Sequence, residues 1–175
     1  MTKLAARPQT SSMTVQETIE SKIQEDFEPH AWMGLVLDHF ARAEQALGNL
    51  SKSLGLPISN GSLSSLKVVR TRLQKVGGKK CKALDQRIAR WSANRPFRHL
   101  LAHATVITLL DATGRVVIVT RHLPRDDNDV TPDRVWTQED QRELLRQASN
   151  DSRSICDHVR NLTADQACLK ALRET

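Results

Sequence analysis

Apolar side chains recur every three or four positions from Ala31 to Leu54, which is the spacing of one face of an α-helix. The stripe is formed by Trp32, Leu35, Val36, Phe40, Ala43, Leu47, Leu50 and Leu54. A shorter helix is predicted from Thr14 to Phe27, and Pro29 marks the break between the two. The first third of the chain is therefore expected to be helical, with a long helix that is buried along one side.

A second helical stripe is interrupted by two glycines. Its apolar positions are Leu63, Leu66, Val69 and Leu73 before the glycine pair, and Cys81, Leu84, Ile88 and Trp91 after it. Each glycine costs about 1 kcal/mol inside a helix, so Gly77 and Gly78 predict a kink or an interruption. Further along, Thr137 and Asp140 fit a capping box, which opens a last long helix carried by Leu144, Leu145, Ala148, Ile155, Val159 and Leu162.

Two β-branched runs, TVITLL and VVIVT, break the helical pattern and are joined by DATG. In that turn Asp111 can accept hydrogen bonds and Gly114 can adopt a positive φ. The pattern predicts a β hairpin at about residues 105–121. Because two strands are marginally stable alone, we expect them to pack on helices or to pair with another chain.

The length of 175 residues fits one domain with a sizeable core. We expect a mainly α fold, a helical bundle with one inserted β hairpin, over residues 13–175. Residues 1–12 predict a mobile polar tail rather than a signal peptide, and no run reaches the roughly eighteen apolar residues of a membrane span. Cys81, Cys156 and Cys168 contain no C-x-x-C pair, which predicts reduced cytoplasmic thiols and neither a zinc site nor a disulfide framework.

Positive charge is concentrated in one part of the chain. The formal net charge is +6, but residues 61–100 carry eleven Lys and Arg against Asp85 alone, a net of +10. Such a field attracts polyanions, and nucleic acid is the expected partner; a solvated face that serves only solubility is the alternative. Aromatic residues make up 3% of the chain, too few for recognition by base stacking. RNA binding should therefore be electrostatic, weakly sequence-specific and sensitive to salt.

The segment NRPFRHLLAHA at residues 94–104 combines charged and titratable groups with apolar ones. Asn94 can cap a helix and Pro96 suits a first turn, so a helix is predicted to begin at residue 95 or 96. Arg98 then lies in the opening turn, where free N–H groups and the guanidinium favour a phosphate. His99 and His103 share a helix face, whereas Arg98 and His103 are roughly 140° apart. Arg98 must reach round the helix, or a second copy of the segment must supply the missing partner.

These residue types suit one chemistry in particular. Histidine titrates near neutrality, so it can take up one proton and return another without a metal. Arginine stays charged and can stabilise the extra negative charge of a phosphorane-like transition state. Together they suit cleavage of RNA by its own 2′-hydroxyl, a reaction that leaves a cyclic phosphate and does not occur on DNA.

The run from Arg98 to His103 resembles the R-x4-6-H signature of HEPN-domain ribonucleases, in which Asn, Asp or His usually follows the arginine. Three pairs in the chain have this spacing, Arg98/His103, Arg115/His122 and Arg153/His158, and only Arg98 is followed by such a residue. The resemblance covers residues 94–104. It implies a helical bundle that dimerises so that two motifs form one composite, metal-independent site. Many family members act in toxin–antitoxin, abortive-infection and CRISPR-linked defence systems, and the hairpin departs from the plainest helical version of the family.

We therefore predict a HEPN-type endoribonuclease that uses no metal and no cofactor. It is expected to be homodimeric and cytoplasmic. Its expected role is that of a toxin or phage-defence effector, restrained by an inhibitor or antitoxin protein. His103 is expected to act as general acid or base, Arg98 to hold the scissile phosphate, and His99 to orient His103 or share its proton transfer. The RNA backbone is expected to contact Lys79, Lys80, Lys82 and Arg95. The alternative is a noncatalytic basic helical module that binds nucleic acid or a partner protein, including helix-turn-helix DNA binding around the glycine pair.

Overall fold

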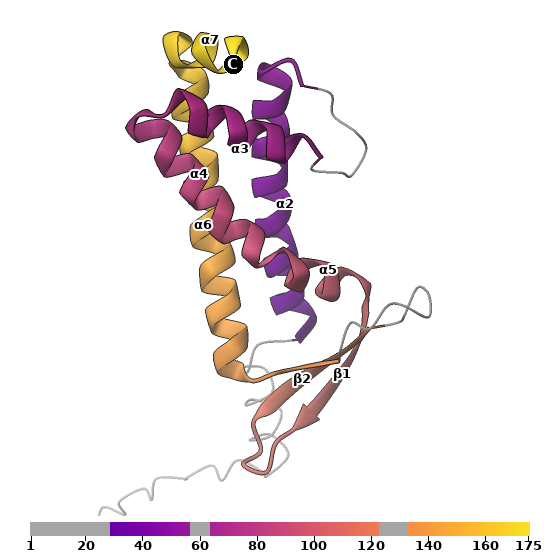
Figure 1. Cartoon of the computed structure of the whole chain (residues 1–175). Coiled ribbons are helices and arrows are strands. Elements are labelled where there is room, and N and C mark those ends of the chain that lie inside the picture. Colours follow the sequence, from indigo (N-terminus) through magenta and orange to yellow (C-terminus); the bar gives the residue numbers. More distant parts are fainter. Residues whose placement is uncertain (1–28, 57–63, 123–132) are drawn as a thin grey trace, which may run out of the picture.

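A computed structural model describes residues 29–56, 64–122 and 133–175 of the chain. The predicted tail at 1–12 and the predicted helix from Thr14 to Phe27 lie outside these residues. The helices are α2 (Pro29–Ser53), α3 (Ser64–Val76), α4 (Gly78–Ala93), α5 (Arg95–His103), α6 (Gln138–Ala164) and α7 (Gln166–Glu174), and the strands are β1 (Ala104–Leu110), β2 (Val116–His122) and β3 (Arg134–Trp136) (Figure 1). The fold is mainly α with a β hairpin after α5, which confirms the predicted fold class.

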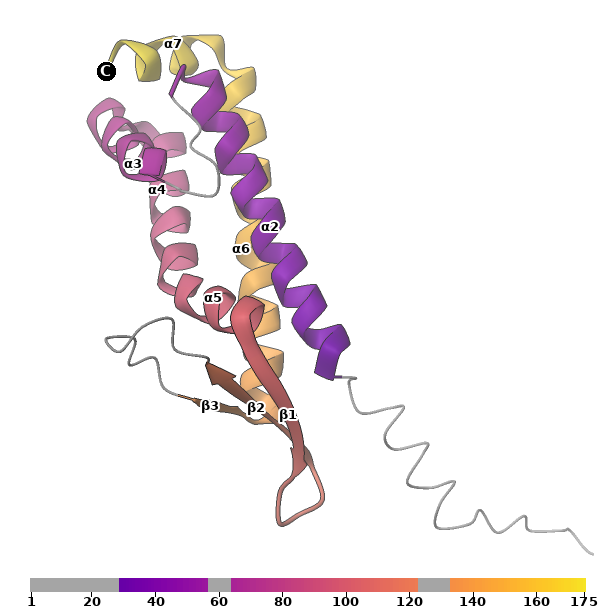
Figure 2. The same cartoon turned by 90° about the vertical axis from the view of Figure 1, so that its right-hand side faces the viewer.

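The long helices α2 and α6 run side by side, α3 and α4 pack against them, and the sheet extends from one end of this bundle (Figure 2). The predicted stripe of α2 forms the centre of the core, and its most buried members are Trp32, Val36, Phe40, Ala43, Leu47 and Leu50. Leu35 is the exception, because it lies on the outer face with 47% of its surface exposed. The apolar periodicity therefore identified the buried face of this helix with one error.

The glycine pair separates two helices, as predicted. Gly77 and Gly78 have φ values of 67° and 74°, a region that L-residues other than glycine seldom adopt. The chain turns back at this point, and α4 packs on α3. Arg70 of α3 and Asp85 of α4 form an ion pair with a nitrogen–oxygen distance of 2.7 Å, which fixes how the two helices lie against each other.

The hairpin also forms as predicted. β1 and β2 pair antiparallel, in a register that places Ala104 opposite His122 and Leu110 opposite Val116. In the turn, Asp111 Oδ1 accepts hydrogen bonds from the N–H groups of Thr113 and Arg115, at 2.7 and 2.9 Å, and Gly114 has a φ of 77°. β3 was not predicted. It pairs with β2, so that the described strands form one antiparallel sheet in the order β1-β2-β3.

The sheet is attached to the bundle through Trp136, the last residue of β3. Its side chain is buried, and its ring centroid lies 5.4 Å from that of Trp32 on α2 and 5.5 Å from that of Phe97 on α5. The indole N–H donates to Thr120 Oγ1 on β2 at 2.9 Å, and the Arg134 guanidinium lies over the rings of Trp136 and Phe97. This aromatic contact holds α5, β2 and β3 in fixed relation to α2.

The C-terminal part of the chain contains two helices. The capping box of Thr137 and Asp140 opens α6 as predicted, but the chain breaks at Asp165, which caps the additional helix α7 by accepting a hydrogen bond from the Cys168 N–H at 3.1 Å. Leu169 and Leu172 bury α7 against the rest of the bundle. Within the described ranges, no helix has both the length and the apolar character needed to cross a membrane.

Candidate functional site

Helix α5 carries the segment in which the site was predicted. It begins at Arg95, as expected, and Leu100 and Leu101 are both buried and anchor it in the core. Asn94 is the N-cap residue of α5, as predicted, and its carbonyl oxygen accepts hydrogen bonds from the Phe97 and Arg98 N–H groups. Its side chain does not take part in the cap; the amide donates a hydrogen bond to Gln147 Oε1 on α6 at 2.9 Å. The start of α5 is thus fixed to α6 by a side-chain contact, and the rest of the helix projects toward the sheet.

The structure brings three imidazoles together. His99 and His103 are both exposed on the predicted common face of α5, with ring centroids 4.6 Å apart and planes inclined by 53°. The third is His122, a buried residue whose ring centroid lies 6.2 Å from that of His99. His122 ends β2 and pairs with Ala104, the residue that follows His103, so the hairpin register delivers it to this place. We refer to His99, His103 and His122 as the histidine cluster.

Arg98 is placed differently. Its Nη2 atom lies 3.4 Å from Glu44 Oε2 on α2, and its side chain is 34% exposed. Arg98 and His103 are about 140° apart round the helix, and their side chains have different neighbours, Glu44 for Arg98 and His99 for His103. The guanidinium and the imidazole therefore occupy neighbouring but different sides of α5. Arg95, predicted to contact RNA, lies half-buried with its guanidinium carbon 5.7 Å from the centre of the Trp91 ring.

The three predicted RNA-binding lysines lie at the opposite end of α4 from the histidine cluster. Lys79, Lys80 and Lys82 occupy the first turns of this 16-residue helix, and a rise of about 1.5 Å per residue separates them from α5 by about 20–24 Å. Lys79 and Lys82 are exposed. Lys80 forms an ion pair with Asp165 at 2.6 Å, and this hydrogen bond raises the pKa of Lys80. Figure 1 shows the start of α4 near α7 and its end near α5.

One cationic residue between the three lysines and α5 was not among the predicted site residues. Arg90 is exposed on α4, and it lies on nearly the same side of the helix as Lys79 because eleven residues correspond to about three full turns. Lys79, Lys82 and Arg90 thus form an exposed basic stripe along α4 that leads toward α5. Arg90 also lines a cleft of about 430 Å³ between α4 and α6. The helical period of the basic residues in this region would have identified the stripe.

The described residues contain no group of three or more His, Cys, Asp or Glu side chains arranged to hold a metal ion. In the histidine cluster, the two exposed imidazoles of His99 and His103 can exchange protons with solvent or with a ligand, and the buried ring of His122 lies beside His99 on the sheet side.

Comparisons with known proteins found no relative of this chain. No protein-family model, curated protein or solved structure matches the chain. A functional assignment therefore depends on the histidine cluster, Arg98 and the basic stripe.

Proposed function

We propose that the protein is a metal-independent endoribonuclease of HEPN type, in which the histidine cluster is the catalytic centre. The observation that carries this proposal is the contact between His99 and His103, two exposed imidazoles whose centroids are 4.6 Å apart on one helix face. A pair of such groups can supply a base and an acid near neutral pH, and it lies one residue from a guanidinium that can bind phosphate.

The reaction requires two proton transfers. His103 removes the proton of a ribose 2′-hydroxyl, the 2′-oxygen attacks the adjacent phosphorus, and the bond from phosphorus to the 5′-oxygen breaks. The departing 5′-oxygen takes up a proton from His99 or from the protonated His103. The products are a 2′,3′-cyclic phosphate and a free 5′-hydroxyl. A guanidinium near the phosphate stabilises the charge that develops on its non-bridging oxygens.

The basic stripe supplies the binding energy for the backbone. About 24 Å separates its first lysine from α5, and a stacked strand with about 3.4 Å between phosphates covers this distance in about seven nucleotides. RNA shorter than this should bind more weakly and with a smaller dependence on salt. Substitution of Lys79 and Lys82 by Ala should reduce the slope of affinity against salt for long RNA but not for short RNA.

The position of Arg98 supports a site shared between two copies of the chain. Because its guanidinium is paired with Glu44 of α2, a second α5 can supply the arginine that completes the site. Mixing the Arg98→Ala and His103→Ala proteins, each inactive alone, should then restore part of the activity through mixed dimers. Mixtures that remain as inactive as their components contradict the shared site but leave a single-chain site intact. Restraint of such an enzyme by an inhibitor or antitoxin protein belongs to the same proposal.

The decisive experiment compares wild type with His103→Ala on end-labelled RNA. Wild type should cut in the presence of EDTA and leave cyclic phosphate ends, and a substrate with 2′-deoxyribose at the cleavage site should resist. His103→Ala should lose most of the activity, while His158→Ala, which changes a half-buried histidine on α6, should retain it. Equal rates for wild type and His103→Ala would falsify the catalytic assignment. RNA binding without cleavage at any pH would instead favour the noncatalytic basic module.

A further inference from the structure

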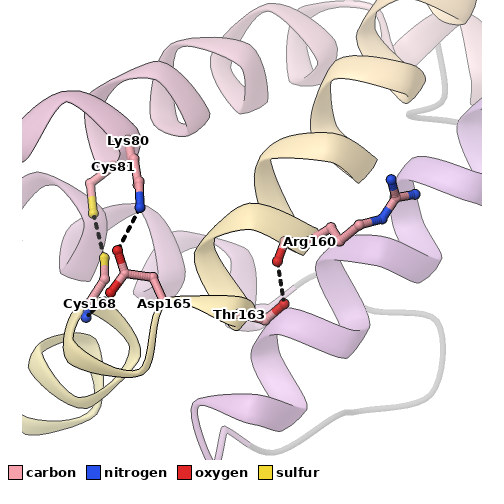
Figure 3. Close-up of polar contacts among 6 residues, drawn as sticks. All are labelled: Lys80, Cys81, Arg160, Thr163, Asp165 and Cys168. Carbon is pink, nitrogen blue, oxygen red and sulfur yellow. Dashed lines mark hydrogen bonds and ion pairs between the residues drawn. The ribbon is translucent and has the colours of Figure 1, made fainter.

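The first turns of α4 and α7 meet through two pairs of side chains, which Figure 3 shows together. The sulfur atoms of Cys81 and Cys168 are 3.7 Å apart, one on each helix. Beside them, Lys80 and Asp165 form their ion pair at 2.6 Å. Two nucleophilic side chains from segments 87 positions apart in the sequence therefore face each other, and neither thiol has a role in the proposed ribonuclease reaction.

We propose that Cys81 and Cys168 are a reversible oxidation site, at which hydrogen peroxide converts the two thiols into a disulfide that joins α7 to α4. A disulfide has a sulfur–sulfur distance of about 2.05 Å, so the two sulfurs must approach by about 1.7 Å. α7 has nine residues and is held by the buried Leu169 and Leu172 and by hydrogen bonds from Arg72 to the Leu172 carbonyl oxygen and from Arg173 to the Ser53 carbonyl oxygen. Rotation of the two cysteine side chains, with a small shift of α7, is therefore expected to close this gap. The proposal does not depend on the ribonuclease activity.

The two thiols differ in a way that assigns their order of reaction. Cys168 is half-buried and lies at the surface end of the pair, whereas Cys81 is 1% exposed. Burial, together with the hydrogen bond to Cys168, raises the pKa of the Cys81 thiol to about 11, so this group retains its proton at neutral pH. Cys168 therefore meets the oxidant first and Cys81 resolves the intermediate.

Oxidation begins at Cys168, the more exposed of the two thiols. The Cys168 sulfur, after loss of its proton, attacks one oxygen of hydrogen peroxide; the oxygen–oxygen bond breaks, Cys168 becomes a sulfenic acid, and water leaves. The Cys81 sulfur then attacks the Cys168 sulfur; the sulfur–sulfur bond forms, the sulfur–oxygen bond breaks, and the hydroxide leaves as water with the Cys81 proton. Two thiols and one peroxide thus give one disulfide and two waters, and a thiol reductant reverses the change.

The expected consequence is a firmer attachment of the C-terminal helix. The bond would close a loop of about 87 residues, and a cross-link over so long a loop restricts the unfolded chain strongly. Oxidation should therefore raise the Tm of the full chain by about 10 °C. The ion pair of Lys80 and Asp165 holds the same two helix ends together and keeps the thiols in register for the reaction.

The test uses the full chain treated with one equivalent of hydrogen peroxide, then alkylated and digested with trypsin. The expected product is a cross-linked peptide that joins Cys81–Lys82 to Asn161–Lys170, lighter than the two separate peptides by two hydrogen atoms and abolished by dithiothreitol. Three results would overturn the proposal: both thiols remaining open to alkylation, a Cys168 sulfinic acid beside a free Cys81, or a cross-link to Cys156.

Matched variants separate the bridge from general effects of oxidation. Cys156→Ser changes the third cysteine, whose sulfur donates to the Arg42 carbonyl oxygen on α2 at 3.8 Å, and it should retain both the linked peptide and the rise in Tm. Cys168→Ser should lose both. If Cys168→Ser folds poorly, the linked peptide in Cys156→Ser still decides the question. A rise in Tm on oxidation of Cys168→Ser equal to that of wild type would contradict the assigned bridge.

Discussion

Truncation of Trp136 to Ala should detach the hairpin from the helical bundle. Trp136 is 1% exposed, and its ring contacts those of Trp32 and Phe97. β3 is only three residues long, and Ile118 of β2 is another buried side chain that the sheet contributes to the core. The substitution therefore tests whether the aromatic contact, rather than strand pairing, fixes the sheet and the histidine it carries.

The expected loss of unfolding free energy follows from the burial of the Trp136 side chain. A tryptophan side chain removes about 200 Å² from water, and about 25 cal/mol per Å² gives about 5 kcal/mol as an upper bound. Truncation of buried tryptophans costs about 3–5 kcal/mol. The Thr120 hydroxyl also loses its indole donor, although it still donates to the Arg134 carbonyl oxygen at 3.3 Å. We expect Trp136→Ala to lose about 4 kcal/mol of unfolding free energy, equivalent to about 8–16 °C in Tm.

Urea unfolding followed by circular dichroism measures this loss. Trp136→Phe keeps an aromatic ring but loses the hydrogen bond to Thr120, so it should cost about 1–2 kcal/mol. Val135→Ala changes the neighbouring residue of β3, which is 57% exposed, and should cost less than about 0.5 kcal/mol. A loss below about 1 kcal/mol for Trp136→Ala, or an equal loss for Val135→Ala, would show that the aromatic contact does not hold the sheet.

Three further substitutions probe the helices. Burial alone raises the pKa of Asp85, but hydrogen bonds from Arg70 and Gln74 outweigh it and hold the pKa below its ordinary value of 3.8. The ion pair of Arg70 and Asp85 therefore stabilises the fold above about pH 4, and this stabilisation is lost as the pH falls further and Asp85 takes up a proton. Asp85→Asn should flatten the acid unfolding curve measured by circular dichroism, and an unchanged curve would refute this. Gly77→Ala places a Cβ at a φ of 67° and should cost about 1–2 kcal/mol in urea unfolding. Gly34→Ala, in α2, places a Cβ with no atom within 4 Å apart from its chain neighbours and the helix's own backbone, and it should stabilise the fold by about 0.5–1 kcal/mol. An effect of the same sign for both glycines would contradict this explanation.

The features that the sequence predicted correctly are those with local causes. The buried face of α2 follows from a spacing of three and four residues, and the break at Gly77 follows from the backbone freedom of glycine. The turn at Asp111 and the capping box at Thr137 depend on side chains that bond to backbone groups two to four residues away. Each of these interactions is complete within one short segment, so the segment alone contains the information.

The features that were missed depend on partners distant in the sequence. Residues 134–136 form a strand because β2 presents free backbone groups and because the core accepts Trp136, and neither condition can be read from three residues. The break between α6 and α7 is different, because Asp165 is a residue type that caps helices well. A helix start at Asp165 could therefore be predicted from the residue type, and it would divide this segment into two helices.

The candidate site also contains both kinds of feature, those with local causes and those that depend on distant parts of the chain. The contact of His99 with His103 follows from their separation by four residues, and the place of His122 follows from the turn, because a hairpin closed at Asp111 sets Ala104 opposite His122. The contact of Arg98 with Glu44 required knowing how α5 is rotated against α2, which no local pattern specifies. This ion pair is only partly exposed, but its nitrogen–oxygen distance of 3.4 Å is long, and a pair of this kind is worth about 1 kcal/mol, so a phosphate can compete with Glu44 for the guanidinium. If it does, Glu44→Gln should tighten RNA binding by severalfold and leave stability nearly unchanged; weaker binding by this variant would show that Glu44 positions Arg98 for the ligand instead of competing with it.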